Sequence, residues 1–179
     1  MLREYDSDTS VTYFLARILD IEHLFGNTQM VQKTFDEIGI PLSDVTFCVI
    51  DFETTGGSAE HDRITEIGAA KYQGGECIRT FQTLVNPGCG IPPFITILTG
   101  ITEAMVMPAP RIEALLGTLR DFIGDSVIVA HNARFDLGFL NAAMIRDDRD
   151  PLTNKVIDTV PLARRLVRSE VKDCKLGTL

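Results

Sequence analysis

The chain has 179 residues, of which 45% are hydrophobic and 23% charged, and its formal net charge is −8. This length and composition predict one main domain with an ample hydrophobic core. The acidic balance argues against a protein that holds nucleic acid by surface charge alone, although bound metal ions can supply positive charge locally. No apolar run approaches the roughly 18 residues that span a membrane, and no secretory signal is visible. The four cysteines are scattered, which is typical of reduced thiols, so we expect a cytoplasmic protein without a membrane partner.

The first part of the chain differs in pattern from the rest. Residues 1–44 predict a helical N-terminal extension with two helices, over about 10–26 and 28–39, and Pro41 then breaks the chain. Residues 45–179 form the main domain. The extension either packs on this domain, which we expect, or docks a partner.

The main domain opens with an apolar run, Val45–Ile50, that ends at Asp51 and Glu53. Its β-branched and aromatic residues predict a buried strand. Acids at positions i and i+2 of a strand point to the same face, and a carboxylate pair there is costly unless something neutralises it. The simplest partner is a divalent cation, and oxygen ligands favour Mg²⁺ or Mn²⁺. The alternative is that both acids lie in a solvated loop beyond the strand.

The following segments alternate between strands and helices. We expect a tight turn at 54–57, a strand from Arg63 to Tyr72, a hairpin turn at 73–76, a third strand from about Cys77 to Val85, and an irregular segment from Pro92 to Thr102. Then come a helix over Ile112–Ile123, a strand over Ser126–Ala130, a helix over Ala133–Arg146, a short strand over Lys155–Asp158 and a helix to about Arg168.

The order β-β-β-α-β-α-β-α predicts an α/β fold with a mixed sheet and helices on its faces. In such a sheet the first and fourth strands can be neighbours. Asp136, just after the fourth strand, would then approach Asp51 and Glu53.

Four segments in this order resemble motifs of the DEDD 3′–5′ exonucleases. They are Asp51–Gly56, Leu98–Thr102, His131–Asp136 and Ile157–Arg164. The second and fourth segments look like motifs of the group typified by the epsilon proofreading subunit of bacterial DNA polymerase III, a DEDDh-type enzyme. The resemblance runs from about Val45 to Leu179 and implies a ribonuclease-H-like fold.

The resemblance also implies a site and a substrate. Asp51, Glu53 and Asp136 would be the catalytic acids and the ligands of two Mg²⁺ or Mn²⁺ ions. Residues expected to contact the substrate are Thr54, Leu98, Thr99 and Asn132. The substrate would be the 3′ end of a nucleic acid, single-stranded DNA in preference to RNA, and a polymerase or repair protein could be a partner.

Several of these residues also suit structural roles. Turn chemistry is an equal alternative for Thr54 and the Leu98–Thr99 segment, and Asn132 suits the cap of the following helix. We expect His131 to be a hydrogen-bonded residue at a strand end and Asp158 to be a cap rather than a fourth acid. Phe135 and Phe139 are expected in the core.

A third motif of this family, H-x-A-x-x-D, supplies a general base and a fourth acid. None of the three histidines of the chain lies in such a context. We interpret the chain as a C-terminally truncated exonuclease domain that is inactive or weak alone, with an active longer parent. Alternatives are a non-catalytic binding or scaffold module of a replication or repair complex, and an RNA exonuclease of the ribonuclease T or oligoribonuclease kind.

Overall fold

The computed structural model describes residues 39, 41–167 and 171–175. The two helices expected before residue 40 therefore lie outside the described residues, apart from Gly39 at the expected end of the second. Of the extension, a short 3-10 helix, η3 (Leu42–Asp44), precedes the main domain. Within the described parts of the chain, no helix is long and apolar enough to cross a membrane.

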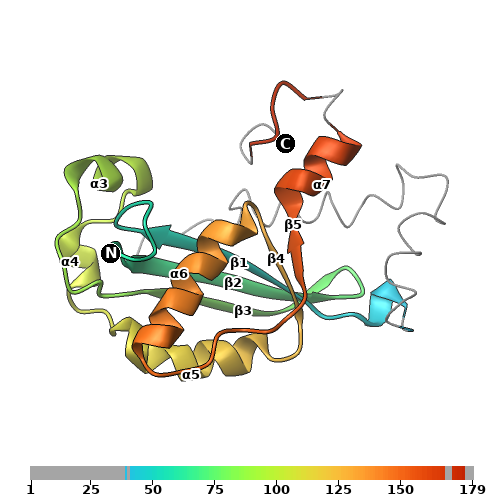
Figure 1. Ribbon diagram of the computed structural model, residues 1–179, viewed down its shortest axis with the longest axis horizontal. Coiled ribbons are helices and arrows are strands. Elements are labelled where there is room, and N and C mark those ends of the chain that lie inside the picture. The colour runs from blue at the N-terminus through green and yellow to red at the C-terminus, as the bar shows by residue number, and fades with distance from the viewer. Residues whose placement is uncertain (1–38, 40, 168–170, 176–179) are drawn as a thin grey trace.

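The centre of the fold is a five-stranded sheet in the order β3-β2-β1-β4-β5 (Figure 1). Its strands are β1 (Phe47–Thr54), β2 (Ile64–Gln73), β3 (Glu76–Leu84), β4 (Val127–Ala130) and β5 (Val156–Asp158). The first three strands form an antiparallel meander, whereas β4 pairs in parallel with β1 and with β5. The predicted mixed sheet is thus confirmed, including the pairing of the first and fourth strands.

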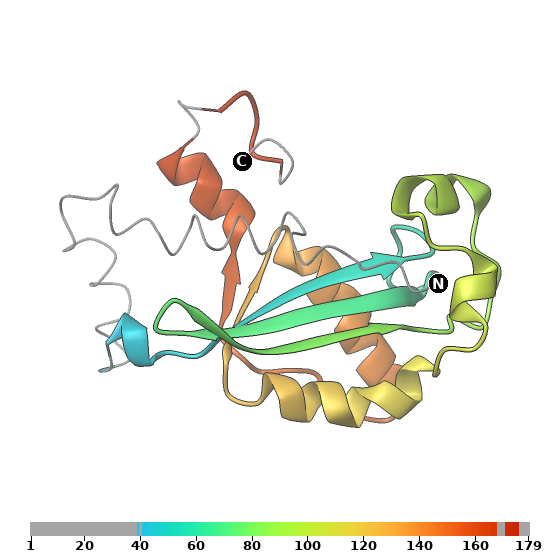
Figure 2. The ribbon, with the colours of Figure 1, turned by 180° about the vertical axis from the view of Figure 1, so that it is seen from behind.

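Helices α5 (Ile112–Ile123) and α6 (Ala133–Arg146) cover one face of the sheet, and the view from behind shows them on its far side (Figure 2). At one end of the molecule lie α3 (Pro93–Thr99) and α4 (Glu103–Val106). Helix α7 (Thr159–Leu166) follows β5 and stands apart from α3, with the start of α6 between them in both ribbon views.

The main core lies between the sheet and helices α5 and α6. On β1, the buried side chains of Cys48, Ile50 and Phe52 face this core. Val49 packs on the opposite face with Tyr72 and Val129. Because side chains alternate along a strand, Asp51 and Glu53 share the face of Val49, away from the main core.

Two expectations about local structure are wrong. Strand β1 does not end at the acids but continues to Thr54, because β2 pairs with it beyond Glu53. Most of the segment expected to be irregular, Pro92 to Thr102, forms α3, and α4 begins directly after it. Pro93 is the first residue of α3, a position where the missing N–H of proline costs nothing, so the proline pair begins a helix rather than preventing one.

Candidate active site

The acids of β1 lie where the strand has a neighbour on one side only. Pairing with β4 ends at Val49, opposite Val129, whereas pairing with β2 continues along the acids. Beyond that point the backbone N–H of Phe52 donates a hydrogen bond of 2.9 Å to Oδ1 of Asp136. The carboxylate of Asp136 therefore reaches the backbone between Asp51 and Glu53, as the strand order predicted.

Asp136 is placed by the first turn of α6, which begins two residues after β4. Asn132, at the N-cap, has a left-handed backbone with φ 63° and ψ 52°, and its carbonyl accepts a hydrogen bond of 2.8 Å from the N–H of Phe135. Its side chain makes no capping bond, so the expected side-chain cap is wrong. Capping side chains normally extend from a β-region backbone, which Asn132 does not have.

The protein raises the pKa of all three carboxyl groups. Burial, and then the charge of Asp51, raise the pKa of Asp136 to about 7, against the opposing hydrogen bond from Phe52. Burial is also the main cause of the raised pKa of Asp51 and of Glu53. Although Asp51 keeps exposed surface, the protein around its carboxylate removes enough water to disfavour the charge. The site thus concentrates negative charge.

A fourth carboxylate, Glu66, belongs to this group and was not singled out from the sequence. Glu66 on β2 lies directly opposite Glu53 in the strand register, and its charge raises the pKa of both Asp51 and Glu53. Its Oε1 accepts a hydrogen bond of 3.0 Å from Nε2 of Gln82 on β3. Like charges directly opposite one another destabilise a sheet. The available signal was that Glu66 is the only acid in the second predicted strand.

The donor chemistry of these residues fits a hard divalent cation. All four side chains offer carboxylate oxygens, and their mutual repulsion would be relieved by a cation. Among the described residues, however, no group of three or more His, Cys, Asp or Glu is arranged to hold a metal ion. The carboxylate oxygens and their negative charge fit a divalent cation. The role of each acid as a metal ligand stays a prediction.

The loop that follows β1, residues 55–63, is fixed by its own polar contacts. The carboxylate of Asp62 accepts hydrogen bonds from the N–H of Ser58 at 2.8 Å and from Oγ1 of Thr55 at 3.5 Å. Gly56 leaves room for this carboxylate, because a Cβ there would lie 2.5 Å from Oδ2 of Asp62. The loop next to the acids is therefore tightly determined.

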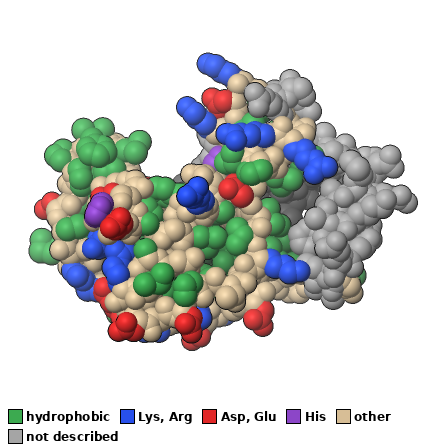
Figure 3. All heavy atoms as spheres, in the orientation of Figure 1, with side chains coloured by type: hydrophobic (Ala, Val, Ile, Leu, Met, Phe, Trp, Pro, Cys, Tyr) green, Lys and Arg blue, Asp and Glu red, His purple; other side chains and the backbone are tan. Residues whose placement is uncertain are grey.

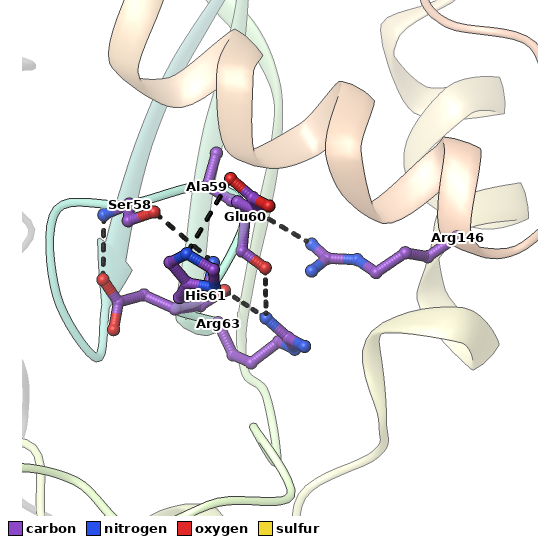
Figure 4. A network of polar contacts seen from close by, with 7 residues as sticks. Ser58, Ala59, Glu60, His61, Arg63 and Arg146 are labelled. Atoms are coloured by element: carbon purple, nitrogen blue, oxygen red, sulfur yellow. Dashed lines mark hydrogen bonds and ion pairs between the residues drawn. The ribbon is translucent and has the colours of Figure 1, made fainter.

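Two arginines also bind carbonyl groups of this loop, Arg63 from within it and Arg146 from α6 (Figure 4). Arg63 donates to the carbonyls of Glu60 at 3.3 Å and Asp62 at 2.8 Å, and Arg146 at the end of α6 donates to the carbonyl of Ala59 at 3.4 Å. Burial and then the charge of Arg63 lower the pKa of Arg146. These contacts connect the loop after the acids to the far end of α6.

The residues expected to contact the substrate divide into two kinds. The hydroxyl of Thr54 donates to the carbonyl of Gly56 at 2.6 Å, and that of Thr99 donates to the carbonyl of Ile95 at 3.0 Å, so both have turn or helix roles. Leu98 instead exposes 78% of its surface on α3.

The space-filling view shows a hollow between the hydrophobic surface of α3 and the basic surface around α7 (Figure 3). The exposed apolar residues of α3 are Phe94, Ile97 and Leu98, and the exposed arginines of α7 are Arg164 and Arg165. Helix α6, which carries Asp136 in its first turn, begins between these two helices in both ribbon views (Figures 1 and 2).

Other residues near the acids have the structural roles expected of them. Nδ1 of His131 lies 2.9 Å from Oγ1 of Thr159, so His131 is a hydrogen-bonded residue at the end of β4. Asp158 caps α7 by accepting a hydrogen bond of 2.9 Å from the N–H of Val160. Phe139 is buried in the core, and Phe135 packs against it with ring centroids 5.0 Å apart.

A protein-family model described as Exonuclease matches residues 48–177. The chain belongs to this exonuclease family, of the DEDD type. The match covers β1 with its two acids, β4 and the start of α6, which together form the acidic site.

Relatives and solved structures agree with this family. The chain is 50% identical over 145 residues to a Mycobacterium tuberculosis protein whose name describes a bifunctional exonuclease/endonuclease, covering 77% of this chain and 22% of that protein. It is 47% identical over 134 residues to DNA polymerase III PolC-type of Clostridium perfringens, covering 75% of this chain and 9% of the polymerase. E. coli exonuclease I in complex with a 5cy-dA13 oligonucleotide shares the fold, with a TM-score of 0.65, 21% identity and coverage of 71% of this chain and 31% of that one.

The chain thus spans about a fifth of the mycobacterial relative and about a tenth of the polymerase. It is an exonuclease domain that is homologous to part of PolC-type DNA polymerase III.

Proposed function

We propose that this chain is a metal-dependent 3′–5′ exonuclease domain that hydrolyses phosphodiester bonds at the 3′ ends of nucleic acids, DNA in preference to RNA. The observation that carries the proposal is the carboxylate of Asp136 on the N–H of Phe52, between Asp51 and Glu53. Membership of the exonuclease family supports the reaction class.

In this proposal Asp51, Glu53 and Asp136 hold two Mg²⁺ or Mn²⁺ ions. When bound, such ions stabilise the negative charge that develops on the attacking and leaving oxygens of the phosphodiester. The carboxylates bind cations in their ionised form, and their raised pKa values mean that a proton must first leave Asp136 near neutral pH. Thr54, Leu98, Thr99 and Asn132 would orient the terminal nucleotide.

DNA is favoured as substrate by the relatives. One relative is a DNA polymerase, and the structural neighbour was solved with a deoxyribonucleotide oligomer. Proofreading during replication, or repair, would then be the process that this domain serves, with a polymerase or repair protein as partner in the cytoplasm. Labelled DNA and RNA of equal sequence, degraded side by side, separate this proposal from the ribonuclease T-like alternative.

The 179 residues hold three acids of the family's four and no histidine in an H-x-A-x-x-D context. Loss of a general base typically slows a reaction by about 10²–10⁴-fold. We do not assign this role to His131, because its Nδ1 lies 2.9 Å from Oγ1 of Thr159. We therefore propose that these 179 residues alone hydrolyse nucleic acid slowly.

A second candidate is a non-catalytic module that binds a strand for a replication or repair complex. It is favoured by the absence, among the described residues, of three side chains already arranged around a cation position. The two candidates differ in metal binding, because only the enzyme needs cations at Asp51 and Asp136.

The test of the proposed reaction is degradation of a 5′-labelled single strand of DNA at high protein concentration with Mn²⁺. Removal from the 3′ end produces a ladder of shorter labelled strands, whereas removal from the 5′ end releases the label at once. Asp51→Ala should abolish the ladder, and Asp125→Ala, which changes an exposed acid in the turn before β4, should not. A ladder that persists in Asp51→Ala would overturn the assignment.

A further inference from the structure

The turn between β4 and α6, residues 130–133, is held by Asp158, the last residue of β5, and Thr159, the first residue of α7. Oδ1 of Asp158 accepts a hydrogen bond of 3.1 Å from the N–H of Asn132, in addition to its capping bond from Val160. Oγ1 of Thr159 lies 2.9 Å from Nδ1 of His131 and 3.4 Å from the carbonyl oxygen of Ala130. Asp158 and Thr159 thus contact three successive residues of the turn.

The turn needs this support because of its backbone. Asn132 has φ 63°, and only one other non-glycine residue in the described part of the chain, Asp148, has a positive φ. Asparagine enters this region more readily than other residues that carry a Cβ, but the left-handed conformation still costs more than the right-handed one, so a partner for its backbone favours it. The N–H of this residue is the group that Asp158 holds.

The turn at 130–133 determines where Asp136 of α6 lies. Helix α6 starts at Ala133, directly after Asn132, and Asp136 lies in its first turn. A rotation of the backbone at Asn132 would move the whole first turn, and with it the carboxylate that accepts from Phe52. The contacts of Thr159 with Ala130 and His131 are well protected, since Thr159 exposes only 2% of its surface.

We propose that Asp158 and Thr159 are positioning residues of the acidic site, which hold the turn at 130–133 so that Asp136 meets the backbone of Phe52. Neither residue is expected to touch substrate or metal. The consequence for metal binding rests on the proposed function, whereas the consequence for the hydrogen bond between Phe52 and Asp136 does not.

The first test follows the amide of Phe52 in the metal-free chain by NMR. In Asp158→Ala we expect its resonance to shift and its hydrogen exchange to accelerate by about tenfold or more. Asp158→Asn keeps an acceptor oxygen and should retain the wild-type behaviour. Adding Asn132→Gly to Asp158→Ala should restore it in large part, because glycine adopts the left-handed backbone without a partner.

The control for the stability of α7 is Arg165→Gly, which weakens the helix at an exposed position away from the turn. An unchanged Phe52 amide in Asp158→Ala, or an equal change in Arg165→Gly, would overturn the proposal. Should Asp158→Ala not fold, Thr159→Val removes the hydroxyl contacts at nearly constant volume. A changed Phe52 amide in Thr159→Val would then support the inference, and an unchanged one would overturn it.

The second test measures Mn²⁺ binding by calorimetry in the same variants. Outer partners of metal sites typically change affinity by about 10- to 100-fold when removed, and we expect such a loss in Asp158→Ala but not in Asp158→Asn. Equal affinity in wild type and Asp158→Ala would overturn the role in the acidic site. If wild type binds no Mn²⁺, the proposed function fails, and the Phe52 amide still decides the positioning role.

Discussion

Oδ1 of Asp136 accepts a hydrogen bond of 2.9 Å from the backbone N–H of Phe52, a residue 84 positions earlier in the chain. The bond exists because β4 stops pairing with β1 at Val49, which leaves the N–H of Phe52 to another acceptor. It brings three carboxylates together at the end of the central strands. Burial and the charge of Asp51 raise the pKa of Asp136 against this hydrogen bond, and the bond itself depends on the placement of α6.

Asp136→Asn should stabilise the metal-free protein increasingly as the pH rises. The pKa of Asp136 is raised to about 7 in the folded chain from an ordinary value of 3.8, so its favourable contribution is complete below pH 4 and is lost as pH rises through 7. The neutral amide avoids this loss. The gap in the free energy of unfolding between variant and wild type should widen by at most about 1.4 kcal/mol per pH unit between pH 4 and 7.

Urea unfolding of both proteins at several pH values in EDTA measures this gap. A gap that is constant from pH 4 to pH 8 would show that Asp136 titrates normally. Excess Mn²⁺ should reverse the order at pH 8, because only the wild-type carboxylate gains from the cation.

Glu66→Gln should raise the stability of the metal-free protein and weaken Mn²⁺ binding. The substitution removes a charge that faces Glu53 across the strand pair, while an amide can still pair with Gln82. We expect a gain of about 0.2–1 kcal/mol in the free energy of unfolding. A purely structural glutamate would instead lose stability on substitution. Glu76→Gln, at the exposed hairpin, serves as the matched control and should change neither quantity.

Gly56→Ala should destabilise the chain, whereas Gly57→Ala should not. A Cβ at Gly56 would lie 2.5 Å from the carboxylate of Asp62, but a Cβ at Gly57 meets nothing within 4 Å. Overpacking of this kind costs about 1–3 kcal/mol. Thermal unfolding of the two variants side by side measures the difference, and equal melting temperatures would mean that Asp62 moves aside freely.

Leu98→Ala should weaken binding of a single-stranded oligonucleotide without changing the melting temperature. Leu98 exposes 78% of its surface, so its removal costs little in folding, whereas contact with a base would bury it. Partial burial of one leucine corresponds to about 1 kcal/mol, or roughly fivefold in affinity. Ile145→Ala, 60% exposed in the last turn of α6, is the control. An equal loss of oligonucleotide affinity in Leu98→Ala and Ile145→Ala would contradict the proposed contact between Leu98 and a nucleotide.

Much of the fold could be predicted from the pattern of apolar residues. The bounds of α5 and α6 agree with the prediction because their apolar residues recur at helical spacing and glycine or left-handed residues mark their ends. The sheet order followed from the crossover helices, which make parallel neighbours of β1 and β4. That order is what predicted the approach of Asp136 to the acids of β1.

The remaining features depend on contacts between distant residues. The place of Glu66 opposite Glu53 is set by strand register, which a one-residue shift would change. Helix α3 is not predicted because a proline pair such as Pro92–Pro93 is typical of an irregular segment, although proline also suits the first position of a helix, where Pro93 lies. Asparagine is a residue that adopts the left-handed backbone, but the hydrogen bond from the N–H of Asn132 to Asp158, 26 residues later, joins distant residues and cannot be predicted from local preference.

The most direct test of the account is a calorimetric titration of the 179-residue chain with Mn²⁺ at pH 8, comparing wild type with Asp51→Asn, Asp136→Asn and the control Asp125→Asn. The account predicts that Mn²⁺ binds wild type and Asp125→Asn alike, and that binding is strongly weakened in Asp51→Asn and Asp136→Asn. Absence of binding in wild type, or equal affinity in all four proteins, would contradict the claim that Asp51 and Asp136 share bound cations.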